Sequence, residues 1–520
     1  MHRILIANRG EIAVRVIRAC RDLQIASIAV YSDCDRAARH VRMADEAIAI
    51  GGNPPAESYL RIDRIVAAAT ASGADAVHPG YGFLAENEEF AHACRDAGLT
   101  FIGPSPEAIA LMGSKTAARQ AAIAAGVTVV PGTESPLGDD AAEDEIARIA
   151  ERIGYPVMVK AVAGGGGKGL RVVAGRGELA GAVRAARSEA GAAFGDSAIY
   201  LERRLAQPRH IEVQVLADRH GTVVPFVERE CSIQRRHQKV VEESPSPVVD
   251  SDLRSRLASA AAAVTAAAGY TNAGTVEFLL DGDGKFYFLE MNTRLQVEHP
   301  VTEAVTGIDL VEWQIRIARG ERLTIDAARA LTPRGHAIEC RVYAEDPDSG
   351  FMPSPGRITA LRTPDGPGIR ADSGVEAGDE VPVYYDALIS KLVASGADRP
   401  QAVARMRRAL AEYDVRGIRT TVPFFRWLLE QPVFLDAAFH TGFLDTLLQQ
   451  RRGTSFSAPE SSLREVALVA AAIYTSLADV SLSGAGHATP SRRRDGGSGV
   501  RPALPNAAWT QQARVESLRE

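Results

Sequence analysis

Residues 290–299 read Glu-Met-Asn-Thr-Arg-Leu-Gln-Val-Glu-His, and this stretch organises the rest of the chain. Read with the two-residue period of a β-strand, its polar side chains fall on one face. That face carries Glu290, Asn292, Arg294, Gln296 and Glu298. The opposite face is apolar apart from one threonine, so it can pack on a core while the polar face lines a site. A solvated edge strand is the alternative, but such strands usually carry lysine and scattered single charges.

A β-hairpin is predicted immediately before this stretch. Residues 274–280 and 285–289 are β-type runs, and the Asp-Gly-Asp-Gly sequence between them is typical of a turn. If Leu280 pairs with Lys285 across the turn, Glu277 lies opposite Phe288. Glu290 is then the diagonal neighbour of Glu277 on the same face.

This register brings Glu277, Glu290 and Asn292 together. Hard cations such as magnesium prefer oxygen ligands from one or two carboxylates, completed by substrate phosphates and water. We therefore predict a metal site at these three residues. The alternative is a pair of glutamates on a wet sheet face, where two like charges would repel each other without a counter-ion.

The composition excludes several classes of protein. A chain of 520 residues is long enough for about three domains. Its net charge of −6 gives no general attraction to nucleic acid. The five cysteines are scattered with no Cys-x-x-Cys, which favours reduced thiols in the cytoplasm over disulfides or a zinc site. Neither a signal-peptide core nor an apolar run long enough to span a bilayer is present, so we expect no membrane partner.

Lysine is rare in this chain. Only six of its 59 basic Lys and Arg residues are lysine. Arginine therefore serves wherever a generic positive charge suffices, and a remaining lysine is more often needed as a compact ammonium. Lys285, beside the hairpin turn, looks like an accidental exception.

The N-terminal region predicts an α/β domain. A strand at residues 3–7, a helix at 12–23 and a second strand at 26–31 imply a parallel sheet with its loops at the carboxyl ends of the strands. A Gly/Pro-rich loop at residues 78–83 is either a functional loop or a plain turn. Helical sequence covers residues 107–125.

The next region predicts a small unit around a glycine loop. Residues 131–140 read as a linker, and strands at 156–162 and 170–173 flank Gly-Gly-Gly-Gly-Lys-Gly at 164–169. The loop matches the dinucleotide-binding glycine pattern, but a strand follows where that pattern needs a helix. Walker A also fails, because Gly169 stands where Ser or Thr should follow the lysine. Glycine N–H groups closing over phosphates as a flap fit better than a flexible linker.

A basic run follows at residues 235–239, Arg-Arg-His-Gln-Lys. Glutamates stand on both sides of it, so a phosphate backbone would meet mixed charge, and a local anion site fits better. Beyond residue 333 strands dominate, and helices at 399–412 and 421–431 close the region. One apolar helix is expected at 463–477, before a Gly/Ser/Arg-rich segment predicted to be disordered.

On these motifs the sequence resembles biotin carboxylase, an ATP-grasp ligase, and in particular the N-terminal part of bacterial acyl-CoA carboxylase α subunits. The resemblance covers about residues 1–445. It is carried by residues 7–13, 78–86, 112–115, the glycine loop, 235–243 and 290–300. Ala163 and Ser114 depart from the usual pattern, and neither change removes a reacting group.

The resemblance implies an α/β fold, α+β overall, with four regions. These are a Rossmann-like domain at 1–110, an ATP-grasp domain at 111–333 with a mobile lid at about 131–205, a β-rich biotin carboxylase C-terminal domain at 334–446, and a truncated linker-like tail at 447–520. It also implies a homodimer, and ATP with Mg²⁺ or Mn²⁺ as cofactors.

The resemblance also assigns site residues position by position. Phosphate, lid, adenine and other nucleotide contacts are Lys115, Lys160, Gly166, Gly167, Glu202, Arg203, Arg204, Leu205, His210, Gln234 and His237. Metal ligands are Glu277, Glu290 and Asn292. The bicarbonate pocket is Lys239, Arg294, Gln296, Val297 and Glu298, and the residues facing biotin are Arg341 and Tyr81. Glu298, Arg294, Lys239 and Arg341 would be catalytic.

The implied reaction is ATP- and bicarbonate-dependent carboxylation of biotin through carboxyphosphate, the first half-reaction of an acyl-CoA carboxylase. Its implied partners are a biotin carrier protein and a carboxyltransferase subunit. Another ATP-grasp ligase, such as a carbamoyl-phosphate-forming enzyme, is the nearest alternative, but we find no glutaminase-type nucleophile. A non-catalytic nucleotide-binding subunit is a second alternative, against which the intact set of Lys239, Arg294 and Glu298 argues.

Covalent biotin needs a lysine, and the last lysine of the chain is Lys391, which lies inside the carboxylase-like region. We therefore expect that this polypeptide is not itself biotinylated and acts on biotin presented in trans, or else is a truncated form of a longer subunit.

Overall fold

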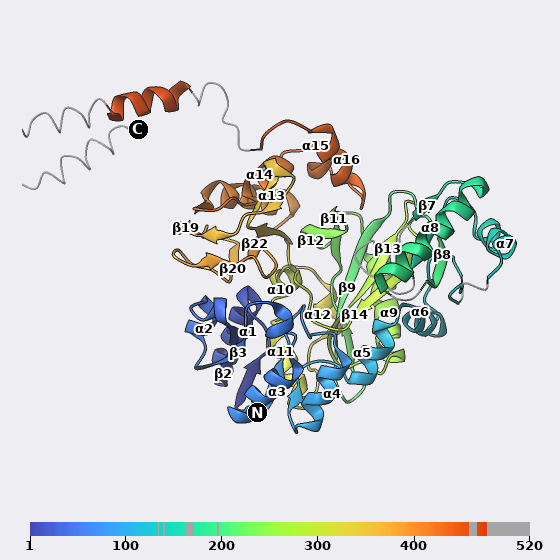
Figure 1. The fold of residues 1–520 in the computed structure, drawn as a ribbon, viewed down its shortest axis with the longest axis horizontal. Helices are drawn as coiled ribbons and strands as arrows, with labels where there is room; N and C mark the ends of the chain where they lie inside the picture. The colour runs from blue at the N-terminus through green and yellow to red at the C-terminus, as the bar shows by residue number, and fades with distance from the viewer. Residues whose placement is uncertain (134, 139–140, 162–170, 195–196, 457–464, 476–520) are drawn as a thin grey trace, which may run out of the picture. The chain divides into compact units, whose positions relative to one another are not determined.

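The computed structural model describes all residues except 134, 139–140, 162–170, 195–196, 457–464 and 476–520. The chain divides into two compact units, Met1–Ser457 and Ala458–Glu520. Figure 1 shows the elements of the first unit, which contains every described residue that the sequence predicted to be functional.

The predicted parallel sheet at the N-terminus is confirmed. Five parallel strands lie in the order β3-β2-β1-β4-β5. The strands are β1 (Arg3–Ile6), β2 (Ala26–Ser32), β3 (Glu46–Gly51), β4 (Ala76–His78) and β5 (Thr100–Phe101). The helices are α1 (Gly10–Asp22), α2 (Arg39–Met43), α3 (Ile62–Ala71) and α4 (Glu88–Asp96), with short 3₁₀ turns at Asp33–Asp35 and Pro55–Glu57. Side chains such as Ile4, Leu5 and Val77 are fully buried in this sheet.

The helical sequence predicted at 107–125 forms two helices, α5 (Pro106–Gly113) and α6 (Lys115–Ala124). Ser114 separates them, and its hydroxyl accepts a hydrogen bond from the Ala117 N–H at the start of α6. Capping by a serine side chain satisfies one of the open N–H groups of a helix. The second helix therefore begins at Lys115.

The small unit around the glycine loop contains both of the strands predicted to flank the loop. Its antiparallel sheet has the order β7-β6-β8, with β6 (Val157–Ala161), β7 (Arg171–Val173) and β8 (Ile199–Arg203), packed by α7 (Glu143–Ile153) and α8 (Arg176–Phe194). The predicted linker at 131–140 is partly wrong, because Gly132 and Leu137 form isolated bridges to β8. Its polar, turn-rich composition did not show that its backbone could pair with a neighbouring strand. The glycine loop lies outside the described residues.

One antiparallel sheet of nine strands forms the centre of the first unit, as Figure 1 shows. Its order is β14-β13-β9-β11-β12-β15-β22-β20, and β10 pairs with β9. The strands are β9 (Arg209–Ala217), β10 (Val223–Pro225), β11 (Arg229–Arg235), β12 (Gln238–Ser244), β13 (Asn272–Leu280), β14 (Phe286–Asn292), β15 (His336–Tyr343), β20 (Ile369–Ser373) and β22 (Leu388–Gly396).

Helices cover this sheet and bury its apolar side chains. They are α9 (Ser251–Ala267), α10 (His299–Thr306), α11 (Leu310–Ala318), α12 (Ala327–Leu331) and α13 (Arg399–Glu412). The predicted helices at 399–412 and 421–431 are confirmed in outline, the second as α14 (Val422–Leu428), followed by α15 (Pro432–Leu435) and α16 (Phe443–Gln450). Phe424, Phe425 and Met406 are buried in the core between α13, α14 and the sheet.

Short strand pairs complete the C-terminal region. They are β16 (Glu345–Asp346) with β17 (Met352–Pro353), β18 (Gly356–Arg357) with β21 (Glu380–Val381), and β19 (Ala360–Arg362) with β23 (Asp414–Arg416); a 3₁₀ turn lies at Pro347–Ser349. Residues 356–362 thus form two short strands with different partners. In the second unit, the described residues 465–475 are helical, within the predicted helix at 463–477. Among the described residues, no helix combines the length and apolar character that crossing a membrane requires.

Candidate active site

The stretch that organises the sequence is a strand only in its first part. Strand β14 ends at Asn292, and α10 begins at His299 with Glu298 as its N-cap residue. The prediction of one strand over residues 290–298 was therefore wrong beyond Asn292. The Glu86 carboxylate accepts a hydrogen bond from the Thr293 N–H at 2.9 Å and holds the backbone away from the sheet, and Pro300 occupies the first turn of α10. Proline favours that position because its φ angle suits a helix start.

The predicted hairpin register was also wrong, by one residue beside the turn and by two residues at Glu277. Glu277 pairs directly with Glu290, while Phe278 pairs with Phe288, because the ladder contains an irregularity between Glu277 and Phe278. A β-bulge inserts one residue into one strand and shifts all pairs beyond it. The two carboxylates are therefore closer than a diagonal pair, which strengthens the reason to expect a cation between them.

Lys239 occupies the centre of a buried group of carboxylates. Its Nζ lies 2.9 Å from Glu277 Oε1 and 2.8 Å from Glu298 Oε1. Glu212 adds a third carboxylate at 2.5 Å. Burial opposes the charge of Lys239, but these three carboxylates raise its pKa well above the ordinary value. The three carboxylates therefore favour the charged ammonium.

Arg341 holds the other side of the Glu298 carboxylate. Its Nη2 lies 2.9 Å from Glu298 Oε2, and its Nε donates to Glu242 Oε1 at 2.7 Å. Glu298 is fully buried, and although burial opposes ionisation, the charges of Lys239 and Arg341 hold its pKa well below the ordinary range. Burial raises the pKa of Glu242 to about 7 against the opposing charge of Arg341.

Arg294 is held within the loop that follows β14. Its Nε donates to Glu86 Oε2 at 2.8 Å, and its Nη1 donates to Gln296 Oε1 at 3.0 Å. Its Nη2 donates to Asn292 Oδ1 at 3.2 Å. Gln296 in turn donates to Glu277 Oε1 at 3.1 Å. The polar side chains of the predicted strand face thus converge, although the backbone that carries them is a loop.

A cavity of about 330 Å³ opens beside these residues. Four of the predicted site residues line it, namely Tyr81, Arg294, Val297 and Arg341. The hydroxyl of Tyr81 is buried and has no hydrogen-bond partner among the described residues. A buried polar atom without a partner is rare and indicates a position for a ligand or water. The predicted loop at 78–83 therefore lines this cavity, together with Arg294 and Arg341.

Of the two predicted phosphate-binding lysines, Lys115 is close enough to Glu290 for its charge to act on that carboxyl. Lys160 in β6 pairs with Glu202 Oε2 at 2.5 Å, and Lys115 is the first residue of α6. Glu290 is exposed as a residue. Desolvation of its carboxyl raises its pKa, and the negative charge of Glu277 raises it further. The positive charge of Lys115 partly opposes this shift. Two directly opposite carboxylates have the donor chemistry that suits a divalent cation.

The remaining predicted nucleotide contacts occupy three positions. His210 in β9 places its Nε2 2.8 Å from Glu277 Oε2, and Gln234 donates to its Nδ1 at 2.9 Å. His237 is exposed at the turn between β11 and β12. The segment from Glu202 to Leu205 ends β8, with its Arg203 and Arg204 N–H groups bonded to Pro131 and Pro156 carbonyls. Gly166 and Gly167 lie outside the described residues.

Sequence reasoning missed three carboxylates of the site, Glu212, Glu242 and Glu86. His210, Glu212 and Gln214 alternate along β9. This two-residue period could have predicted that Glu212 shares a polar face with His210. A fully buried arginine, Arg229, pairs with Glu212 and donates to Gln214 and Thr302. Nothing local distinguishes Glu242 or Glu86 from other glutamates, because their partners are distant in the sequence.

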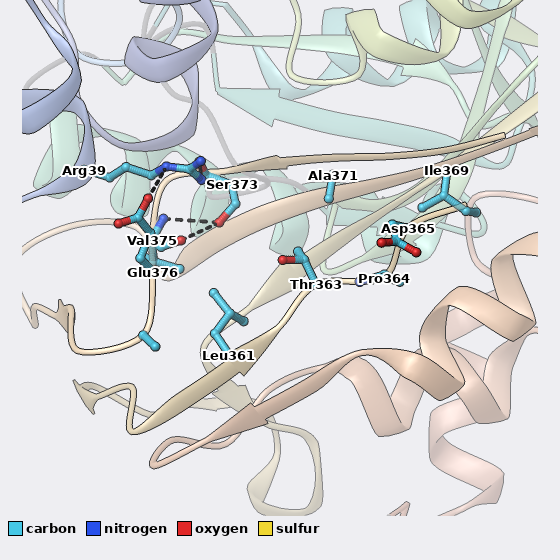
Figure 2. Close-up of a pocket in the computed structure, with 11 residues that line it drawn as sticks. Arg39, Leu361, Thr363, Pro364, Asp365, Ile369, Ala371, Ser373, Val375 and Glu376 are labelled. Atoms are coloured by element: carbon cyan, nitrogen blue, oxygen red, sulfur yellow. Dashed lines mark hydrogen bonds and ion pairs between the residues drawn. The ribbon is translucent and has the colours of Figure 1, made fainter. Parts of the chain in front are cut away.

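A second hollow, of about 530 Å³, lies beside β19 and β20 (Figure 2). Arg39 lies at one end of it, 3.0 Å from Glu376 Oε1, and donates to the Ser373 carbonyl. Its floor contains the apolar side chains of Leu361, Ile369 and Ala371. Its lining includes none of the predicted site residues, so we do not assign it to the active site.

Three family models match the chain. They are described as "Biotin carboxylase, N-terminal domain" at residues 1–109, "Carbamoyl-phosphate synthase L chain, ATP binding domain" at 114–326 and "Biotin carboxylase C-terminal domain" at 339–446. Among curated proteins, the chain is 53% identical over 445 residues to a biotin carboxylase of Nostoc, covering 86% of this chain and 99% of that protein. It is 49% identical over 445 residues to a biotin carboxylase of Bacillus subtilis, covering 85% and 98%.

Solved structures agree with this similarity. The biotin carboxylase–βγ-ATP complex from Campylobacter jejuni has a TM-score of 0.81 at 46% identity, covering 85% of this chain and 98% of that one. The biotin carboxylase domain dimer of Hydrogenobacter thermophilus 2-oxoglutarate carboxylase, with MgADP, ADP and bicarbonate, has a TM-score of 0.82 at 46% identity, covering 88% and 99%. With the site residues assembled around Lys239 and Glu298, the chain belongs to the biotin carboxylase family of ATP-dependent ligases.

Proposed function

We propose that this chain carboxylates biotin on a carrier protein, using ATP and bicarbonate, through carboxyphosphate. One observation carries the proposal: the Glu298 carboxylate lies between Lys239 and Arg341, beside a cavity that Arg294 and Val297 also line. Similar solved structures described as complexes with ATP, with MgADP and with bicarbonate support the choice of substrates.

In this proposal Arg294, which lines the cavity, and Lys239, which contacts Glu298 beside it, bind bicarbonate. Arg294 offers a planar fork that matches a carboxylate-like anion, and Lys239 offers a point charge. Glu298 then removes the bicarbonate proton. A base works best when its pKa is near the working pH, whereas two cations hold the pKa of Glu298 well below that range. Bound bicarbonate must therefore compensate part of the positive charge of Lys239 and Arg341. The pKa of Glu298 then rises towards the range in which it can accept a proton.

The nucleotide lies at the other end of the same site. Lys115 and Lys160 would contact its phosphates, the segment from Glu202 to Leu205 its adenine, and His210, Gln234 and His237 its remaining groups. Gly166 and Gly167 would close over it and exclude water, which would otherwise hydrolyse carboxyphosphate. A divalent cation, magnesium or manganese, held by Glu277, Glu290 and Asn292 would neutralise the β- and γ-phosphates.

Biotin would occupy the part of the cavity formed by Tyr81 and Arg341. The Arg341 guanidinium would stabilise negative charge that develops on the ureido oxygen of biotin while its nitrogen is carboxylated. The unpartnered Tyr81 hydroxyl supports a polar ligand at this position.

We further propose that this polypeptide is not itself biotinylated, and that biotin is presented to it in trans or on a further part of a longer subunit. Lys391, the last lysine of the chain, is fully buried in β22 and cannot reach a biotinylating enzyme in the folded protein. Intact mass and a streptavidin blot of the purified chain test this, and a mass increase equal to one biotin would contradict it. A carboxyltransferase would then use the carboxybiotin to carboxylate an acyl-CoA, which completes an acyl-CoA carboxylase.

Four organisational features belong to the same proposal. They are a homodimer, a cytoplasmic location, the domain limits at residues 110, 333 and 446, and a lid at about 131–205. The similar Hydrogenobacter thermophilus structure is described as a domain dimer, which supports the first of these. Five free cysteines support the second.

The test is ATP cleavage by the purified chain with bicarbonate and magnesium, measured with and without free biotin, together with incorporation of labelled bicarbonate into biotin. We expect ATP cleavage that requires bicarbonate and increases with biotin. Labelled product on biotin identifies the acceptor, and ATP cleavage without any labelled biotin would contradict the proposal.

A further inference from the structure

Lys391 lies in the middle of β22 and is fully buried. Its cross-strand partners are Arg341 in β15 and Asp372 in β20. Directly paired residues of neighbouring strands project their side chains from the same face of a sheet. The lysine therefore stands beside Arg341, on the face of the sheet that carries the proposed site.

The Lys391 ammonium makes its shortest contact with the backbone of the bicarbonate pocket. Its Nζ donates to the Val297 carbonyl at 2.9 Å. Glu11, at the start of α1, lies farther away, with its Oε2 3.3 Å from Nζ. Asp372 is already held by both Nε and Nη2 of Arg370, at 3.0 and 2.7 Å. The Val297 carbonyl is thus a principal partner of this buried charge.

Val297 immediately precedes Glu298, the proposed base. Arg341 holds the Glu298 carboxylate, and its neighbour Lys391 holds the carbonyl one residue earlier. The segment between β14 and α10 belongs to no strand or helix, so side-chain contacts must determine its position. Two adjacent cations of one sheet therefore hold the backbone and the side chain of the same segment.

We propose that Lys391 is a positioning residue, which holds the Val297 carbonyl so that Glu298 and the bicarbonate pocket keep their productive geometry. This inference rests on the proposed function. The competing explanation is that Lys391 only balances the charge of Glu11. A buried charge is costly unless it is paired, so either role would retain it. The two roles differ in which partner matters.

Two variants separate these roles. Lys391→Met removes the ammonium and keeps a similar length, and Lys391→Met/Glu11→Gln also removes the carboxylate left without its cation. Lys285→Met, at an exposed lysine beside the hairpin turn, is the matched control. For each protein the measurements are kcat, KM for bicarbonate and ATP, the melting temperature, and hydrogen exchange of peptides covering residues 293–300.

We expect kcat of Lys391→Met to fall by about 10- to 100-fold, because displacement of a reacting group by about 1 Å has an effect of that order. KM for bicarbonate should rise, while KM for ATP stays within about twofold of the original value, since the nucleotide contacts lie elsewhere. The double variant should recover melting temperature but not kcat. Exchange in residues 293–300 should be faster in both variants, because their carbonyl contact is lost.

Recovery of kcat together with melting temperature in the double variant would overturn the inference and leave Lys391 as the counter-ion of Glu11. Unchanged exchange in residues 293–300 would overturn it as well, whatever the activity. An original protein that does not label biotin would instead contradict the proposed function, and the exchange measurement would still decide whether Lys391 holds this segment.

Discussion

At the scale of single residues, the site depends on one ammonium among three carboxylates. Lys239 contacts Glu212, Glu277 and Glu298 at 2.5–2.9 Å, and its side chain is 12% exposed. An ammonium is a compact charge that can donate in three directions, whereas a guanidinium is a planar fork. The geometry therefore requires lysine and not merely a positive charge.

We expect Lys239→Arg to lower kcat by about 10²-fold, because a larger planar group cannot meet three carboxylates at these distances. Steady-state rates of biotin carboxylation measure the effect. Lys285→Arg, at an exposed lysine that pairs with Asp283, is the control and should keep the original rate. A normal rate in Lys239→Arg would show that this position needs only a positive charge and not a compact ammonium.

Glu298→Gln should lower biotin carboxylation by about 10²- to 10⁴-fold, the usual contribution of a general base. ATP affinity, measured by calorimetry, should change little because the proposed nucleotide contacts do not include Glu298. Glu430→Gln, at an exposed glutamate paired with Arg407, is the control. If Glu298→Gln keeps its carboxylation rate, another group must act as the base.

At the scale of elements, the β13–β14 hairpin determines the proposed metal site. The irregularity between Glu277 and Phe278 places Glu277 directly opposite Glu290. Directly opposite side chains are closer than diagonal ones, and like charges there are unfavourable without a counter-ion. The raised pKa of Glu290 agrees with this, since desolvation of its carboxyl and then the Glu277 charge oppose its ionisation.

We expect Glu290→Gln to raise the magnesium concentration needed for half-maximal ATP cleavage by about tenfold, because one charged ligand becomes neutral. A magnesium titration at saturating ATP and bicarbonate measures this. Asp283→Asn, which removes a carboxylate from the exposed turn of the same hairpin, is the matched control and should leave the titration unchanged. An unchanged magnesium dependence in Glu290→Gln would remove Glu290 from the metal site.

At the scale of the whole first unit, contacts far apart in the sequence hold the N-terminal helix to the large sheet. Glu11 at the start of α1 meets Lys391 in β22, and Arg15 of the same helix pairs with Glu303 in α10 at 2.9 Å. Burial raises the pKa of Glu11 to about 7, with the Lys391 charge acting in the opposite direction. Its protonation is therefore coupled to the stability of this contact.

Because the folded-state pKa of Glu11 lies above its ordinary value of 4.5, the folded protein binds this proton more tightly than the unfolded chain. The associated stability is fully present below about pH 4.5 and is lost as pH rises through about 7. Glu11→Gln should therefore become more stable relative to the original protein between about pH 5 and pH 8, by on the order of 2 kcal/mol. Denaturant unfolding at several pH values, with Glu430→Gln as control, measures this, and parallel pH profiles would contradict it.

The sequence by itself determined the class of fold and the identity of most polar residues of the site. Period-two alternation and glycine-rich turns are local properties, so the parallel N-terminal sheet, the hairpin and the set from Glu290 to Glu298 could be predicted from them. Only the tertiary structure decided where β14 ends, because Glu86, about 200 residues earlier, holds Thr293 away from the sheet. It also decided that Glu212, Glu242 and Lys391 surround the site, since register, bulges and long-range ion pairs depend on packing between distant segments.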